Sequence, residues 1–346
     1  MSDQPRPLRA PGSSGRDCDL ADKVAWLQGR QREGDESIET HFAWVFLTSD
    51  RAWKLRKPVR RDTMDYGSLE ARRRNSEAEV RLNRRLAPQV YLGTRALTMD
   101  TMGRFAIGGE GDVVDWLVEM RRLDRSRMLD RRLARGEVAA GDLDRLVAQM
   151  ATFYATERPT VTDPAALAAR LHAQVAANER VIATLDTGSA QTLGESQHTF
   201  VAAHPDWLAA RAAGGCIVEA HGDLRPEHIH LDDPPAVIDC LEFDRNLRIL
   251  DRAEELEFLA LECARLGHAA IGERIAAECL GRLGDAVPRA LQRFYRSHRA
   301  ATRARLYIWR AAEPDDGNPQ LWHARAREYL DGAVEAAREA AANETL

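Results

Sequence analysis

The order of hydrophobic and polar residues divides the chain into a strand-rich first part and a helix-rich second part. Leu20, Val24 and Leu27 recur at helical spacing and predict a short helix. The next stretch, "ESIETHFAWVFLTSDRAWKLRKPV", is rich in β-branched and aromatic residues and is broken by the turn-like "TSDR", which predicts a hairpin of two or three strands. "YLGTRALTMD" and "RFAIGGEGDVVDWLVEMRRL" predict further strands with glycine turns.

A longer helix is expected between these strands, over "SLEARRRNSEAEVRLNRRLAP". Ser68 is a suitable N-cap residue and Pro88 cannot continue a helix, so these two residues bound it. Val80, Asn83 and Leu86 fall roughly on one face. The first part of the chain therefore predicts an antiparallel sheet with one prominent helix.

Helices predominate from about Asp124 onwards. "DLDRLVAQMATFYATER" is amphipathic, because Leu143, Leu146, Val147 and Met150 share one side. Further helical stretches are expected at about 164–186, 198–213, 251–266, 268–283, 286–311 and 320–342. One short β-rich patch interrupts them, between the second and third of these stretches.

Length and pattern together predict a two-lobed α+β protein, because a chain of 346 residues is long for one small domain. Residues 1–19 are polar and rich in Pro, Gly, Ser and Arg, which predicts a disordered tail. Residues 20–118 predict an N-terminal lobe built on the antiparallel sheet. Residues 119–346 predict a larger, mostly helical C-terminal lobe with a small β insert.

Composition argues against several classes of protein. A net charge of -5 gives no general reason to expect nucleic acid or an anionic membrane as a partner. No apolar run approaches the ~20 residues that span a bilayer, and the N-terminus lacks the apolar core of a signal peptide, so we expect a cytoplasmic protein. The five cysteines are scattered and contain no Cys-x-x-Cys pair, which disfavours a disulfide framework and a zinc site.

The densest group of chemically active residues is "HGDLRPEHIHLDDPPAVIDCLEFD". Asp223 follows the strand-like "CIVEAH", and Arg225 and His228 come within five residues of it. If "IHL" pairs with "AVI" across "DDPP", the hairpin brings Asp239 close to this loop. A proton-accepting carboxylate, metal ligands and a fixed positive charge are what phosphoryl transfer requires. The alternative is a solvated turn with unrelated carboxylates.

This stretch also resembles a known family. "HGDLRPEHI" resembles the catalytic loop of eukaryotic-like kinases, and its His-Gly-Asp opening is similar to that of the aminoglycoside phosphotransferase and choline kinase branch. "AVIDCLEFD" resembles the metal-binding Asp segment of that branch. The resemblance covers roughly residues 37–265 and is closest to a bacterial group of uncharacterised small-molecule kinases. It implies a protein-kinase-like fold, with nucleotide bound by the N-terminal lobe, and the catalytic loop and acceptor pocket in the C-terminal lobe.

The resemblance also implies roles for individual residues. It implies ATP and Mg²⁺ as cofactors, with Asp223 as the catalytic base, Asp239 as the main magnesium ligand and Arg225 facing the γ-phosphate. Asp251 resembles the Asp that opens a helix behind such a site. His228 stands where the family has Asn, and imidazole is a poorer magnesium ligand than an amide oxygen. His228 therefore binds metal directly, binds it through water, or marks weakened activity.

A kinase also needs a cation on the α- and β-phosphates. "RAWK" resembles the strand that carries this lysine, which indicates Lys54. Its partner should be Glu79 or Glu77, and the sequence barely separates them. Either glutamate could instead be an exposed partner for Arg81 or Arg73.

Two further pairs of residues are candidates for nucleotide contacts. The glycine-rich phosphate loop of protein kinases is absent, and Thr40 and His41 lie where it would be. A turn-forming or buried role competes with phosphate binding for both residues. In "LVEMRRL", backbone groups near Glu119 and Met120 are candidates to meet adenine.

The leading hypothesis is an ATP-dependent kinase that phosphorylates a hydroxyl of a small molecule, of the aminoglycoside, sugar or amino alcohol class. The alternative is a catalytically weak nucleotide-binding regulatory module, a pseudokinase, which His228 and the missing glycine loop motivate. Nucleic-acid binding through "EARRRNSEAEVRLNRR" and "EMRRLDRSRMLDRRLARG" is disfavoured, because acids accompany the arginines at helical spacing and the whole protein is acidic. Acceptor identity, ATP against GTP preference and oligomeric state do not follow from the sequence.

Overall fold

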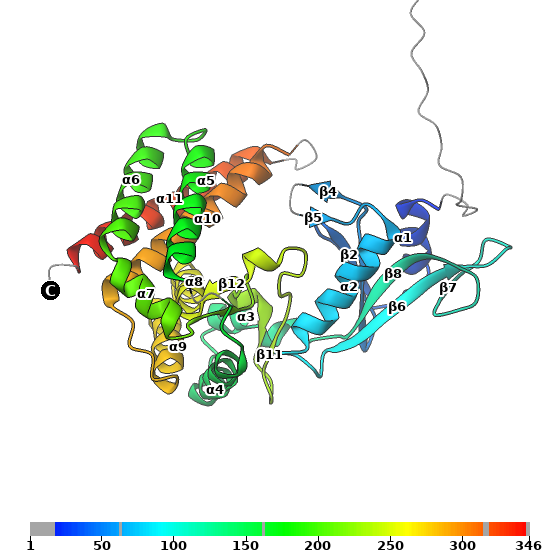
Figure 1. Ribbon diagram of the computed structural model, residues 1–346. Coiled ribbons are helices and arrows are strands. Elements are labelled where there is room, and N and C mark those ends of the chain that lie inside the picture. Colours follow the sequence, from blue (N-terminus) through cyan, green and yellow to red (C-terminus); the bar gives the residue numbers. More distant parts are fainter. Residues whose placement is uncertain (1–17, 62–63, 161–162, 314–317, 344–346) are drawn as a thin grey trace, which may run out of the picture. The chain divides into compact units, whose positions relative to one another are not determined.

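The computed structural model describes residues 18–61, 64–160, 163–313 and 318–343 (Figure 1). The chain divides into two compact units. The first comprises Met1–Arg81 and Val90–Arg122, and the second comprises Leu82–Gln89 and Leu123–Leu346. The predicted disordered tail lies outside the described residues, apart from Cys18 and Asp19.

The first unit contains a six-stranded antiparallel sheet with the strand order β1-β2-β3-β8-β6-β7. Its strands are β1 (Glu36–Glu39), β2 (Ala43–Leu47), β3 (Arg51–Arg56), β8 (Asp112–Arg121), β6 (Tyr91–Met99) and β7 (Phe105–Ile107). The stretch predicted as a hairpin thus forms three strands. Two short strands, β4 (Arg60–Arg61) and β5 (Met64–Asp65), pair separately.

Two helices accompany this sheet, α1 (Leu20–Gln28) and α2 (Leu69–Asn83). The Ser68 hydroxyl accepts the amide hydrogen of Ala71 at 3.1 Å, as expected of an N-cap residue. Apolar residues of α1 pack against the sheet in one buried cluster: Val24, Leu27, Phe46, Leu55, Leu97 and Leu117. Burial of these apolar side chains holds α1 against the sheet.

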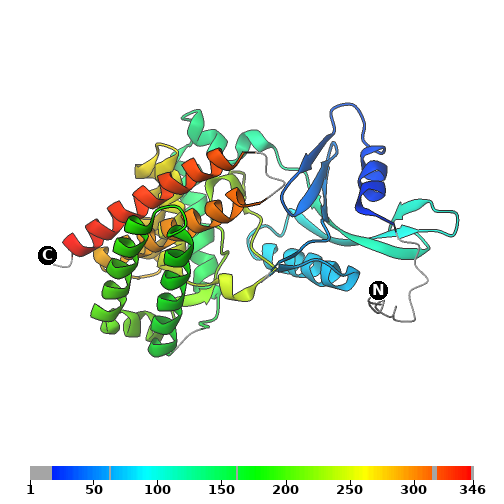
Figure 2. The same ribbon diagram turned by 90° about the horizontal axis from the view of Figure 1, so that it is seen from above.

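The second unit is mostly helical. Its helices are α3 (Leu129–Ala134), α4 (Ala140–Thr156), α5 (Pro164–Ile182), α6 (Thr187–Ala203), α7 (Pro205–Ala213), α8 (Arg252–Arg265), α9 (Ala269–Arg282), α10 (Arg289–Ala311) and α11 (Pro319–Ala342). The helices α10 and α11 lie side by side in both views, as do α5 and α6 (Figure 1, Figure 2). A mixed α/β architecture with an N-terminal antiparallel sheet is the fold class that the sequence predicts.

One predicted helix boundary was wrong. The stretch expected at 198–213 is two helices, and the first begins eleven residues earlier, at Thr187. The Asp186 carboxylate caps α6 by accepting the amide hydrogen of Ser189 at 3.0 Å. Pro205 lacks an amide hydrogen and occupies the first position of α7, so the chain breaks before it.

The small β insert lies inside this helical unit. Strand β9 (Ile217–Glu219) pairs antiparallel with β12 (Ile249–Asp251). The predicted hairpin is present as β10 (Ile229–His230) and β11 (Ala236–Val237), with Ile229 opposite Val237. The loop that carries Asp223 therefore follows β9, and Asp239 follows β11.

Hydrophobic burial fixes the helices around this insert. Residues of α4, α8 and α10 share one core cluster with the insert, including Leu146, Met150, Leu256, Phe294 and Ile229. Full burial of each such side chain stabilises the fold by about 1.5–3 kcal/mol relative to exposure. Within the described residues, no helix is both long and apolar enough to cross a membrane.

Candidate active site

Lys54 lies on β3 of the first unit and forms an ion pair with a buried glutamate of α2. Its Nζ atom is 2.9 Å from Oε1 of Glu79, whose side chain is 1% exposed. Arg56 shares a strand face with Lys54 and contacts the second oxygen of the same carboxylate. Glu77 is exposed and pairs instead with Arg73 at 3.1 Å. Glu79, rather than Glu77, is therefore the partner of Lys54.

Thr40 and His41 occupy the turn between β1 and β2. The Thr40 hydroxyl donates to the carbonyl oxygen of Ala43 at 2.8 Å and accepts the amide hydrogen of Ala43 at 3.0 Å. The His41 ring meets Phe42 edge-on, with centroids 4.2 Å apart. Both side chains thus have local partners, and their contact with phosphate stays a prediction.

Glu119 and Met120 lie inside β8, with strand partners on β3 and on β6. The Glu119 carboxylate pairs with Arg95 at 2.7 Å and with Arg51 at 3.4 Å. These ion pairs hold neighbouring strands together. The predicted contact of this segment with adenine depends on backbone groups and stays a prediction.

In the second unit, the loop after β9 is anchored by helix α8. The carboxylate of Glu255 is buried and accepts the amide hydrogens of His221 at 3.1 Å and Gly222 at 2.6 Å. Gly222 has φ +91°, and an added Cβ would come within 3.1 Å of Leu241. Only glycine suits this conformation without strain. Hydrogen bonds from its backbone therefore fix the start of the loop that leads to Asp223.

His221 contributes to the same anchoring. Its Nε2 atom donates to the carbonyl oxygen of Ile238 at 2.8 Å, and its Nδ1 atom accepts the amide hydrogen of Asp223 at 3.3 Å. Burial lowers the pKa of His221 to about 3, so its ring is neutral. His221 holds the loop backbone, which is the structural role expected from the sequence.

Asp223 is the next residue of this loop after Gly222, and its carboxylate lies between two guanidinium groups. Its carboxylate accepts from Nε of Arg225 at 3.0 Å and lies 3.8 Å from Nη1 of Arg303. Burial by itself would raise the pKa of Asp223, but Arg225 and then Arg303 outweigh it and hold the pKa at about 2. The carboxylate is therefore ionised throughout the physiological range, and its side chain is still 17% exposed.

His228 lies between the two acidic residues predicted to carry the chemistry. Its Nδ1 atom donates to the main-chain carbonyl oxygen of Asp223 at 2.9 Å. Its Nε2 atom accepts from Nη2 of Arg225 at 3.1 Å and is 3.7 Å from Oδ2 of Asp239. The 3-10 turn Pro226–His228 and the β10–β11 hairpin produce this arrangement.

Asp239 has an unusual backbone conformation. At φ +63° it is the one non-glycine residue with positive φ in the part of the chain that the structure describes. Such a conformation costs of order 1–3 kcal/mol and is typical of functional positions. The neighbouring Cys240 amide donates to Oδ1 of Asn83 at 2.9 Å, which fixes the segment. The Asp239 side chain is 48% exposed and so accessible to a ligand.

These residues fit a magnesium ion in part. Mg²⁺ prefers oxygen ligands and is usually held by one or two carboxylates together with substrate phosphates. Asp239 offers such a carboxylate. His228 does not fit as a direct ligand, because its Nε2 lone pair already accepts from Arg225. Among the described residues, no group of three or more His, Cys, Asp or Glu side chains could hold a metal.

Two other residues at this loop, Glu255 and Arg303, have no signal in the sequence that distinguishes them. Glu255 lies 32 positions after Asp223, on a helix with several other acids. Arg303 lies on α10, among many arginines of similar spacing.

Asp251 behaves as the resemblance implied, because it caps α8 by accepting the amide hydrogen of Ala253 at 2.8 Å. Its carboxylate also forms a buried ion pair with Arg211 at 2.7 Å.

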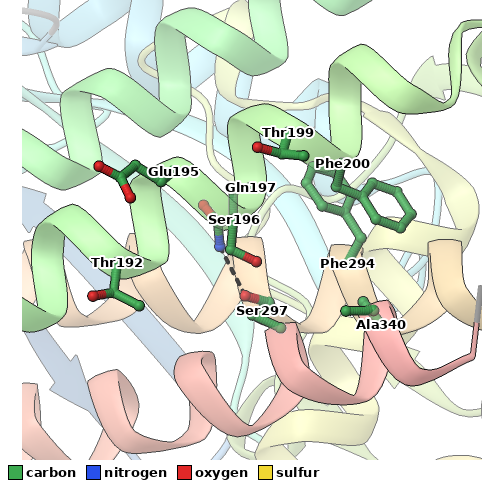
Figure 3. A pocket seen from close by; sticks show the side chains of 11 residues that line it. Thr192, Glu195, Ser196, Gln197, Thr199, Phe200, Phe294, Ser297 and Ala340 are labelled. Atoms are coloured by element: carbon green, nitrogen blue, oxygen red, sulfur yellow. Dashed lines mark hydrogen bonds between the residues drawn. The ribbon is translucent and has the colours of Figure 1, made fainter.

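A separate pocket of about 270 Å³ lies among α6, α10 and α11 (Figure 3). Gln197 donates to the Ser297 hydroxyl at 2.8 Å on one side, and the rings of Phe200 and Phe294 stack on another. The residues that line it do not include those of the loop that carries Asp223. This pocket is therefore a feature of the helical packing, distinct from the Asp223 site.

Solved structures identify the class of protein to which this fold corresponds. The chain is similar to the GDP complex of wild-type aminoglycoside 2'-phosphotransferase-IIIa, with a TM-score of 0.55, 16% identity, and coverage of 91% of this chain and 96% of that one. A choline/ethanolamine kinase family protein from Mesorhizobium loti gives a TM-score of 0.51 at 12% identity, covering 93% and 100%. The protein thus has the protein-kinase-like fold of the aminoglycoside phosphotransferases and choline kinases, as the catalytic-loop motif implied.

Sequence comparison adds more specific relatives. Three uncharacterised proteins, one from Mycobacterium bovis and two from strains of Mycobacterium tuberculosis, are each 34% identical to the chain over 289 residues. The match covers 82% of this chain and 56% of each relative, so the chain spans little more than half the length of these curated relatives. No family model matches the chain.

Proposed function

We propose that the protein is an ATP-dependent phosphotransferase that moves the γ-phosphate to a hydroxyl group of a small molecule. The observation that carries this proposal is the pair of carboxylates, Asp223 and Asp239, which lie 3.8 Å and 3.7 Å from the two ring nitrogens of His228. The Asp223 carboxylate is ionised and accepts from Arg225, and the Asp239 carboxylate is 48% exposed. The kinase-like fold supports the same reading.

In this mechanism Asp223 orients the acceptor hydroxyl. As the acceptor oxygen bonds to the γ-phosphorus, its proton passes to Asp223, and the bond from the γ-phosphorus to the bridging oxygen breaks. Arg225 meets the charge on the transferring group. Lys54, oriented by Glu79, binds the α- and β-phosphates. Asp239 would hold a magnesium ion, which would neutralise charge on the phosphates when bound.

The test is nucleotide consumption against a panel of sugars, aminoglycosides, amino alcohols and nucleosides. Both ATP and GTP are supplied, because one structural neighbour is a GDP complex. We expect turnover with at least one acceptor, and we expect Asp223→Asn to abolish most of it while nucleotide binding is largely kept. Near-normal activity in Asp223→Asn would exclude this residue as the base.

The second candidate is a nucleotide-binding regulatory module with little catalysis. The hydrogen bond from Arg225 to Nε2 of His228 favours it, because this bond removes the second metal ligand that a kinase uses. Nucleotide binding without phosphate transfer to any acceptor of the panel would support this candidate. Measured turnover on one acceptor would remove it.

A further inference from the structure

Helix α10 presents two arginines, one turn apart, to the catalytic loop. Arg299 donates from Nη2 to the carbonyl oxygen of Gly222 at 2.9 Å. Arg303, four residues later, places Nη1 at 3.8 Å from Oδ1 of Asp223. Residues four apart lie on the same helix face, so α10 directs a cationic face at the base. Arg225 approaches the same carboxylate from the loop itself.

Arg303 is largely enclosed, but not all of its donors have hydrogen-bond partners. Its side chain is 13% exposed, yet its Nε atom has no hydrogen-bond partner among the described residues. It donates to the Tyr307 hydroxyl at 3.2 Å, while its distance to the Asp223 carboxylate exceeds a hydrogen bond. A guanidinium has five donors, and buried donors are normally satisfied. The Nε atom is enclosed by the fold, so the donor capacity that remains for an anion beside Asp223 is that of Nη1, which faces the Asp223 carboxylate at 3.8 Å.

Among the described residues beside Arg303, the aromatic rings and the carboxylate of Glu262 already have cationic or hydrogen-bonding partners. Arg303 lies over the Tyr307 ring at 5.1 Å and Arg265 over the Tyr329 ring at 4.0 Å. These aromatic faces already hold guanidinium groups and so are not available as a cage for an ammonium group. The buried carboxylate of Glu262 accepts from the Tyr329 hydroxyl at 2.6 Å and lies 3.5 Å from Arg265. Its charge is thus also matched within the fold.

We infer that the acceptor is a hydroxyl compound that carries an anionic group, a carboxylate or a phosphate, bound by Arg303 beside the reactive hydroxyl. This inference rests on the proposed phosphotransferase function and narrows its substrate class. A polycationic aminoglycoside or an amino alcohol would place an ammonium group against Arg225 and Arg303. A sugar acid, a hydroxy acid or a sugar phosphate would instead supply an anionic group that accepts hydrogen bonds from Arg303.

The test is binding measured by calorimetry on the full chain, with Mg²⁺ and a non-hydrolysable ATP analogue present. The probes are matched sets: glucose with gluconate, glucose 6-phosphate and glucosamine, and glycerol with glycerate, glycerol 3-phosphate and serinol. We expect anionic members to bind about tenfold or more tightly than the neutral and cationic members of their set. Comparison of the carboxylate and phosphate members identifies which anion fits.

Two variants of α10 locate the binding site. Arg303→Gln should remove the preference for anions, and Arg303→Lys should restore part of it. Arg289→Gln, at an exposed position of the same helix, makes the same change of charge and should leave the preference intact. Thermal unfolding of each variant shows that it is folded. An unchanged preference in folded Arg303→Gln, or no binding by any anionic probe, would overturn the inference.

Turnover separates this inference from the proposed function. Anion binding that depends on Arg303, without phosphate transfer from ATP or GTP, would contradict the phosphotransferase and leave the anion site standing. Transfer to a neutral or cationic acceptor at the same rate in Arg303→Gln would support the phosphotransferase and contradict the anionic acceptor.

Discussion

The imidazole of His228 donates from Nδ1 to the carbonyl oxygen of Asp223 at 2.9 Å, and its Nε2 atom faces the carboxylate of Asp239 at 3.7 Å. A single ring thus links the backbone of the candidate base to the candidate metal ligand. Because Nε2 of His228 accepts a hydrogen bond from Arg225, the ring separates Asp223 from Asp239 and helps to position both residues.

Replacement of His228 by asparagine should strengthen metal binding. Asn can keep the donor to the Asp223 carbonyl and present an amide oxygen, which is a better magnesium ligand than imidazole. We expect His228→Asn to lower the Mg²⁺ concentration for half-maximal turnover by about tenfold, one factor of ten being 1.4 kcal/mol. His228→Ala serves as control and should raise that concentration. An unchanged magnesium dependence in both variants would argue against any role of His228 at the metal.

Removal of the Glu79 carboxylate should be far more damaging than removal of Glu77. Glu79→Gln leaves Lys54 and Arg56 without a buried counter-charge, which typically costs about 3–5 kcal/mol. Glu77→Gln loses an exposed pair with Arg73 and should change stability by about 0.5 kcal/mol or less. Urea unfolding and nucleotide binding of both variants measure the difference. Equal effects of the two substitutions would show that the Lys54 pair does not matter.

Alanine at Gly222 should disturb the catalytic loop. The φ of +91° alone costs a Cβ-bearing residue about 1–2 kcal/mol, and the added Cβ also meets Leu241 at 3.1 Å. Gly267 is a matched control, with φ +85° and nothing within 4 Å of an added Cβ. We expect Gly222→Ala to lower both stability and kcat, and Gly267→Ala to lower stability alone. Normal kcat in Gly222→Ala would show that the loop tolerates the shift.

The free energy of unfolding should decrease as the pH is lowered, and His221 should account for part of this decrease. Its pKa is lowered to about 3 in the folded state, against about 6.5 in an unfolded chain. The unfolded chain therefore binds the extra proton first, so the stabilisation is complete above pH 6.5 and is lost as pH falls towards 3. His221→Gln should flatten the dependence of the unfolding free energy on pH between 7 and 5 by about one proton. An identical slope in wild type and variant would contradict this assignment.

Local sequence predicted much of the candidate catalytic segment. Asp223, Arg225, His228 and Asp239 lie within 17 consecutive residues, and the pairing of β10 with β11 follows from two short apolar runs across a proline turn. Because these residues depend on one hairpin, their order along the chain largely sets their arrangement. The predicted Lys54 strand and the helix capped by Ser68 are local patterns of the same kind.

The partners contributed by distant segments were not predictable in the same way. Glu77 and Glu79 are the same residue type, two positions apart on α2, so local sequence does not distinguish them. Only packing buries Glu79 and leaves Glu77 exposed to water. Glu255 and Arg303 are ordinary members of charged helices until α8 and α10 pack against the loop. No local pattern distinguishes a helix face that meets a carboxylate from one that meets solvent.

The sequence by itself determined the order of elements and the candidate catalytic segment from Asp223 to Asp239, with its kinase-like motif. These depend on hydrophobic periodicity and short-range pairing, which are properties of neighbouring residues. The tertiary structure alone decided which charges become buried partners: Glu79 for Lys54, Glu255 for the loop amides, and Arg303 for Asp223. Burial and electrostatic pairing arise from packing between distant segments, so they are set only when the chain is folded.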